Sequence, residues 1–145
     1  MARCAVSGKT DALVTSLRGP SVYATTGIRP QIRSVEVFNT TASAFDISIV
    51  RATATGTQGT ALTEVCLSDD SRTVITTGFN THTANATVGA ALRTASLGAA
   101  IGAGVIWTWG PGELIIDNLT TAGLVIILAN STTAQHLNFA FEWDE

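Results

Sequence analysis

The chain contains few charged residues. Only 13% of its 145 residues are Asp, Glu, Lys or Arg, about half the share that is usual in a soluble domain, and Lys9 is its single lysine. Small uncharged side chains, among them 23 threonines, supply most of the polarity. Because removing a charge from water is costly, the centres of protein interfaces are depleted of charged residues. We therefore expect the protein to cover much of its surface with other protein molecules.

Long hydrophobic runs are also missing. The longest mostly apolar stretch, residues 97–107, is rich in glycine and far shorter than the ~20 residues that a membrane helix needs. Residues 1–10 include no apolar run of signal-peptide length. We expect a protein that is made in the cytoplasm and has no membrane partner.

The chain has only two cysteines, Cys4 and Cys66. The sequence does not show whether they meet, and in a reducing compartment we expect two free thiols. A zinc site made by these cysteines with His82 and His136 would lack the paired ligand spacing that such sites use. The sequence thus predicts no metal.

Catalytic motifs are absent from the sequence. There is no Gly-x-Ser-x-Gly elbow, no phosphate-binding loop and no His-x-His metal pair. We interpret His82 and His136 as structural residues, and Asp69 and Asp70 as part of a turn rather than as half of a calcium site. An opposed pair of carboxylates, as in glycosidases, is not excluded by sequence alone. The prediction is a protein that is not an enzyme and has no cofactor.

The residue pattern favours strands over helices. Threonine and valine prefer strands, and residues 137–143 alternate strictly between large apolar and mostly polar side chains. Residues 32–38 and 45–49 also read as strands, and we expect them to form a hairpin. Residues 124–128 are a continuous apolar run, typical of a central strand that is buried on both faces.

Turn signals separate the remaining segments. We expect a turn at residues 68–71 between two strand-like runs, and a strand, turn and strand over residues 105–117. Residues 53–60 and 78–104 read as long loops, the second with room for a short helix within residues 88–97. Seven or eight short strands predict an all-β fold: a single antiparallel β-sandwich of the jelly-roll type.

Charge is distributed unevenly along the chain. Residues 1–33 have a net charge of +4 and the remainder −7. We predict an extended N-terminal arm, residues 1–30, and a β-sandwich domain, residues 31–145. The basic side chains of the arm are candidates for contact with an acidic neighbouring surface: Arg3, Lys9, Arg18 and Arg29. The pI of about 5.2 and the lack of a dense basic patch argue against a nucleic-acid partner.

Trp107 and Trp109 are two residues apart, so both face the same side of a strand. They could form an exposed platform for a glycan, and we favour a place in the core or at a subunit interface. Together with the apolar run after residue 123 they give four candidate residues for the interface of a trimer: Trp107, Trp109, Leu124 and Ile126.

Several short phrases resemble those of small structural proteins of tailed bacteriophages. They are IRSVEVF (residues 32–38), VRATATGTQGTALTE (50–64), THT (81–83), GVIW (104–107) and FEWDE (141–145). Within that group the chain resembles head decoration, or cement, proteins. The resemblance implies a jelly-roll-like body that binds the outer capsid surface as a trimer, clamps neighbouring capsomers and has the major capsid protein as its partner. It transfers no functional residue to this chain.

Three other functions stay open at this point. The main alternative is a trimeric receptor- or carbohydrate-binding jelly roll of a phage tail, which would bind glycans at Trp107 or Trp109. An enzyme would need a buried acidic pair, to which nothing in the sequence points. A head-to-tail connector would form a ring rather than a trimer.

Overall fold

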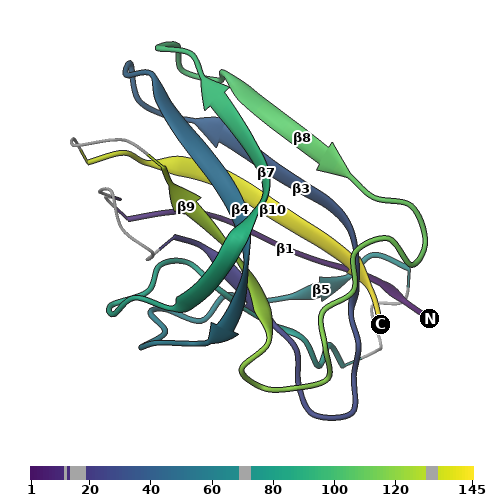
Figure 1. The fold of residues 1–145 in the computed structure, drawn as a ribbon. Helices are drawn as coiled ribbons and strands as arrows, with labels where there is room; N and C mark the ends of the chain where they lie inside the picture. The colour runs from purple at the N-terminus through teal and green to yellow at the C-terminus, as the bar shows by residue number, and fades with distance from the viewer. Residues whose placement is uncertain (12, 14–18, 69–72, 130–133) are drawn as a thin grey trace.

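A computed structural model of the chain describes residues 1–11, 13, 19–68, 73–129 and 134–145. It is all-β, with two antiparallel sheets of five strands packed against each other (Figure 1). None of the described residues belongs to a helix. The predicted β-sandwich is therefore confirmed.

Each sheet combines strands from both ends of the chain. The first sheet has the order β5-β1-β10-β3-β8, with the bounds Val65–Cys66, Arg3–Lys9, Leu137–Asp144, Gln31–Asn39 and Gly104–Thr108. The second sheet has the order β6-β2-β9-β4-β7, with the bounds Thr77–Phe79, Ser21–Tyr23, Gly123–Leu128, Phe45–Ala54 and Thr87–Leu97.

Strands from the first half of the chain pair with strands from the second half in reverse order, as in a long hairpin folded over itself. β1 lies beside β10, β2 beside β9, β3 beside β8 and β4 beside β7, all antiparallel. β3 and β4 belong to different sheets, so the expected hairpin between residues 32–38 and 45–49 is wrong. The connection from β3 to β4 crosses from one sheet to the other. The inward side chains of the two strands then meet in the same core from opposite sides.

The core depends on the aromatic face of β10. Leu137, Phe139, Phe141 and Trp143 all point between the sheets and are buried, as their alternation in the sequence predicts. Phe139 and Phe141 meet edge to face, with ring centroids 6.0 Å apart. Because β10 lies between β1 and β3, burial of this face joins the two halves of the first sheet.

β9 is buried on both of its faces, as predicted from its apolar run. Leu124 and Ile126 point into the core between the sheets, and Val125 belongs to a second apolar cluster on the outer face of the second sheet. The chain between β4 and β7 covers that cluster, with Ala86 buried against it. No described segment covers the outer face of the first sheet in this way, because its outward residues remain partly or fully exposed along most of β1 and β8.

The predicted N-terminal arm, residues 1–30, is wrong. β1 pairs with β10 along its whole length, from Arg3 to Lys9, and β2 pairs with both β9 and β6. Cys4 and Val6 alternate with partly exposed residues and are buried in the core. This alternation of buried and exposed residues is the physical reason that the segment forms a strand. The basic residues beside it obscured the alternation in the sequence.

Two further expectations are corrected. Residues 78–104 are not a loop, because they contain β7, the longest strand, and residues 88–97 lie within it rather than in a helix. β7 is an edge strand with most side chains in water. Its sequence therefore shows no regular alternation of apolar and polar residues. Residues 113–117 form only an isolated bridge between Ile115 and Gln31. Of the predicted turn at 68–71, only Ser68 lies within the described residues.

Gly59 should be among the most sensitive glycines of the fold. A Cβ atom at this position would overlap the carbonyl oxygen of Thr81, whereas one at Gly89 would meet no atom closer than 4.0 Å, the carbonyl oxygen of Arg51. We expect Gly59→Ala to lower the free energy of unfolding by about 1–3 kcal/mol and Gly89→Ala to leave it equal or slightly higher. Urea unfolding of both variants checks this, and equal stability of the two would contradict the close approach at Gly59.

Candidate functional site

Four exposed apolar side chains surround the short edge strand β5. They are Met1, Val65, Leu67 and Ile75, which are 80%, 51%, 57% and 36% exposed. Hydrogen bonds tie their segments to the start of β1. The N–H of Leu67 donates to the carbonyl oxygen of Arg3 at 2.6 Å, and Glu145 bonds both to Ala2, next to Met1, and to the N–H of Ile75. We call these four residues the β5 corner. Clustered apolar exposure of this kind is typical of interaction sites.

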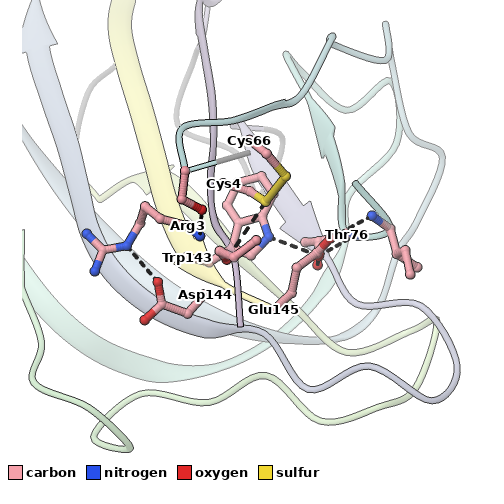
Figure 2. The surroundings of a disulfide bond; sticks show 10 residues. Arg3, Cys4, Cys66, Thr76, Trp143, Asp144 and Glu145 are labelled. Atoms are coloured by element: carbon pink, nitrogen blue, oxygen red, sulfur yellow. Dashed lines mark hydrogen bonds and ion pairs between the residues drawn. A yellow bond between two sulfur atoms is a disulfide. The ribbon is translucent and has the colours of Figure 1, made fainter. Parts of the chain in front are cut away.

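A disulfide bond between Cys4 and Cys66 holds β5 in place (Figure 2). The two cysteines are directly opposite each other in the pairing of β1 with β5, and Trp143 is the partner of Cys4 on the other side, in β10. The expectation of two free thiols is therefore wrong. Residues 62 positions apart in the chain become neighbours only through the pairing of the sheet, which no local pattern reveals.

The side chain of Glu145 fixes the other segment of the β5 corner. Its carboxylate accepts hydrogen bonds from the N–H groups of Ile75 and Thr76, from the Thr76 hydroxyl at 2.6 Å and from the indole N–H of Trp143 at 3.1 Å (Figure 2). The backbone of Glu145 also exchanges two hydrogen bonds with Ala2. Ile75 is thus tied to the same short stretch of β-structure as β5.

Hydrogen bonds control the charge of both acidic residues at this end of β10. Partial burial alone would raise the pKa of Glu145, but the donors around its carboxylate outweigh burial and hold the pKa below its usual value. Asp144 has a lowered pKa for the same reason, since the guanidinium groups of Arg3 and Arg33 outweigh the effect of burial. Both carboxylates are therefore ionised at neutral pH.

The basic residues predicted to lie on an arm are dispersed in the structure. Arg3 is in β1 and binds Asp144, with its Nε 2.6 Å from Oδ1. Lys9 lies at the exposed end of β1, and Arg29 forms an exposed ion pair with Asp117 at 3.2 Å. Arg18 lies outside the described residues. Arg3 and Lys9 lie at opposite ends of β1 and so do not share one contact surface.

The four predicted trimer-interface residues have two different environments. Leu124 and Ile126 are fully buried in the core of the protomer, so they have no surface to offer to a second copy and their assignment to an interface is wrong. Trp107 and Trp109 face the same side, as predicted, and are partly buried against the core. They lie at the β8 edge, at the opposite end of the first sheet from β5.

The histidines occupy structural positions. His82 is buried, and its Nε2 lies 2.7 Å from the hydroxyl oxygen of Ser21, which is also buried. Burial lowers the pKa of His82 and raises the pKa of the adjacent Tyr23 to about 12, so both are neutral at pH 7. A serine and a histidine at this distance resemble part of a hydrolytic site, but no substrate can reach this pair in the folded protein. Nδ1 of His136 contacts the carbonyl oxygen of Thr10 at 3.1 Å.

Two general findings concern the described residues alone. No group of three or more His, Cys, Asp or Glu residues lies in a position to hold a metal ion. No helix is long and apolar enough to cross a membrane.

Sequence reasoning missed the β5 corner. Its members are separated single apolar residues between polar ones, and single exposed apolar residues are normal in any protein. Only the proximity of β5, the N-terminal residues and Ile75 turns them into a patch. Cys66 beside Val65 and Leu67 was the one available signal, because a disulfide there would imply a fixed edge.

Loss of the disulfide should weaken the whole fold. We expect the double variant Cys4→Ala/Cys66→Ala to lose about 2–4 kcal/mol of the free energy of unfolding, because a closed loop of this length restricts the unfolded chain. Urea unfolding with and without dithiothreitol measures the effect. The reductant should lower the stability of the wild-type protein and leave the variant unchanged, and a wild-type protein indifferent to reductant would show that the bond contributes nothing.

Acid should destabilise the protein through Glu145. A carboxylate with a lowered pKa contributes stability that is complete at neutral pH and is lost as the pH falls below about 4.5. We expect Glu145→Gln to lower the free energy of unfolding by about 1–2 kcal/mol at neutral pH and to reduce the loss of stability between about pH 5 and pH 3.

Asp117→Asn is the matched control for Glu145→Gln, because its ion pair with Arg29 is exposed. It should change stability by less than ~1 kcal/mol. Denaturant unfolding at several pH values measures both variants. If Glu145→Gln kept the full acid dependence of the wild-type protein, the proposed role of this carboxylate would be wrong.

Comparison of the chain with models of protein families, with curated protein sequences and with solved structures found no match. A function must therefore be argued from the arrangement of the residues themselves.

Proposed function

We propose that the chain is a viral structural protein of the capsid decoration, or cement, type, which binds the outer head surface of a tailed bacteriophage as a homotrimer. In this role its partners are further copies of itself and the major capsid protein, and its location is the surface of the virion. The observation that carries the proposal is the β5 corner, an apolar patch that a disulfide and hydrogen bonds hold in place at the edge of a protein with few charges.

The β5 corner has the properties expected of a subunit contact. Apolar side chains contribute most to an interface when they are already ordered before binding, because less conformational entropy is then lost. The disulfide orders Val65 and Leu67 through Cys66, and Glu145 orders Ile75. A three-fold axis beside this edge would bring the same corner of three copies together and remove it from water.

The connectivity of the strands supports a jelly roll. Eight strands pair as β1 with β10, β2 with β9, β3 with β8 and β4 with β7, across two sheets. Folding one long antiparallel ribbon over itself produces this pattern, and jelly rolls, a fold that viral capsid proteins use, consist of eight strands in two sheets. β5 and β6 extend the two sheets beyond that set.

The uncovered outer face of the first sheet suits a broad contact with a shell. Small side chains occupy its middle, including Ala5, Ser7 and Ala140. Its charged groups largely neutralise one another, since Asp144 binds both Arg3 and Arg33. Paired charges cost less to remove from water than unpaired ones, and three such faces per trimer would bind together with higher avidity than one.

Oxidation of the cysteines is compatible with this role. A decoration protein is made in a reducing cytoplasm, where disulfides rarely persist, and then leaves the cell with the virion. The bond between Cys4 and Cys66 would be stable in that second environment.

The solution mass of the purified protein tests the proposal. We expect light scattering after size exclusion to give about 45 kDa, three times the 15.0 kDa chain. Leu67→Lys should reduce the mass to that of a monomer with unchanged circular dichroism, because a charge would have to be buried at the contact.

Leu119→Lys is the matched control, because Leu119 is 59% exposed and Leu67 57%, and it lies in the segment between β8 and β9. It should leave the trimer intact. A wild-type protein that is monomeric at every concentration would overturn the proposed trimer, and a trimer that Leu67→Lys does not affect would exclude the β5 corner as its contact.

A further inference from the structure

A groove of about 380 Å³ lies between the two sheets at the edge opposite the β5 corner. Arg51, Leu92 and Arg93 line it from β4 and β7 of the second sheet. Trp109, Glu113 and Leu114 line it from the segment that follows β8. Its volume is at the small end of the range of ligand sites, roughly 300–1,000 Å³, which suits a ligand of about one ring.

Two arginines and one carboxylate, Glu113, line the groove, so its formal charge is positive. In the described part of the chain neither Arg51 nor Arg93 forms an ion pair, whereas Arg3, Arg29 and Arg33 all do. Nη1 of Arg51 donates to the carbonyl oxygen of Ile115 at 2.7 Å, which orients the guanidinium and leaves its other N–H groups available. A planar guanidinium held in this way matches a carboxylate, which can accept two parallel hydrogen bonds.

The remaining walls offer an aromatic surface and a hydrogen-bond acceptor. Trp109 is partly buried against the core, and its backbone N–H donates to the carbonyl oxygen of Arg33 at 3.0 Å, so that its position is fixed. Oε2 of Glu113 accepts a hydrogen bond from the N–H of Gly110. No described residue donates to the second carboxylate oxygen, Oε1, which can accept a hydrogen bond from a ligand hydroxyl.

We propose that this groove binds a sugar acid, a pyranose ring that carries a carboxylate. Such a ligand combines the three groups that the walls can recognise. Its carboxylate would bind Arg51 and Arg93, the C–H face of its ring would lie on the electron-rich face of Trp109, and a hydroxyl would donate to Glu113. A neutral sugar would leave the two guanidinium groups unpaired, and an aliphatic acid would leave Trp109 uncovered.

The inference does not depend on the proposed trimer. All six lining residues belong to one protomer, and the groove lies beside the β8 edge of the first sheet, away from β5. A monomeric protein could therefore bind the sugar acid, and a trimer could fail to bind it. Each proposal can thus be refuted without refuting the other.

Titration with D-glucuronate, followed by the indole N–H signals in ¹H–¹⁵N NMR spectra, tests the inference. The Trp109 signal, identified by its loss in Trp109→Phe, should shift upon saturation. We expect D-glucose to bind at least about tenfold more weakly, because it lacks the carboxylate that accepts from the guanidinium groups. Arg93→Gln should weaken glucuronate binding by about tenfold, because one charged donor to that carboxylate is lost. Higher salt should weaken glucuronate binding as well.

Arg29→Gln is the control, because Arg29 is exposed, already paired with Asp117 and absent from the groove. It should bind glucuronate as the wild-type protein does. Equal affinities for glucuronate and glucose, an unchanged affinity in Arg93→Gln, or no shift of the Trp109 signal would each overturn the proposal. Binding of D-glucose 6-phosphate or inorganic phosphate without binding of glucuronate would also overturn it, and would show a phosphate site instead.

Discussion

The structure depends on the burial of one aromatic strand face. β10 brings Phe139, Phe141 and Trp143 between the sheets, and its backbone pairs with β1 on one side and β3 on the other. Each of these side chains contributes about 1.5–3 kcal/mol when it leaves water. Without β10 the strands β5 and β1 would have no connection to β3 and β8, and the β5 corner would lose Trp143 and Glu145, which support it.

The two edges of the first sheet, β5 and β8, differ in the side chains beside them, and the two proposals assign them different partners. At the β5 end, apolar side chains are exposed, and Arg3, Asp144 and Glu145 all have partners. Beside the β8 edge, aromatic and apolar groups are partly buried, and the guanidinium groups of Arg51 and Arg93 in the second sheet form no ion pair with a described residue. The first arrangement favours contact with protein, since few charges need to be desolvated. The second favours a small anionic ligand, since the charges are already positioned.

Sequence reasoning succeeded where burial imposes a strict pattern and failed where it does not. The alternation of residues 137–143 and the apolar run of 124–128 predicted β10 and β9, because central strands are constrained on one or both faces. The edge strand β7 escaped detection, since most of its side chains are in water. The disulfide and the β5 corner depend on pairing between distant segments, and so does the proximity of Arg51 to Trp109. No local pattern contains that information.

The position of the last two strands also has a consequence for how the protein is made. β9 and β10 occupy interior places in the two sheets, although they are synthesised after all the other strands. Neither sheet can be completed while the ribosome is still adding residues 123–144. Until then the earlier strands lack their pairing partners and have unpaired edges. Cys4 and Cys66 are then both present but not yet held together by β10. Of the described strands, the one that lies beside Cys4 on the side away from Cys66 is therefore the last to be made.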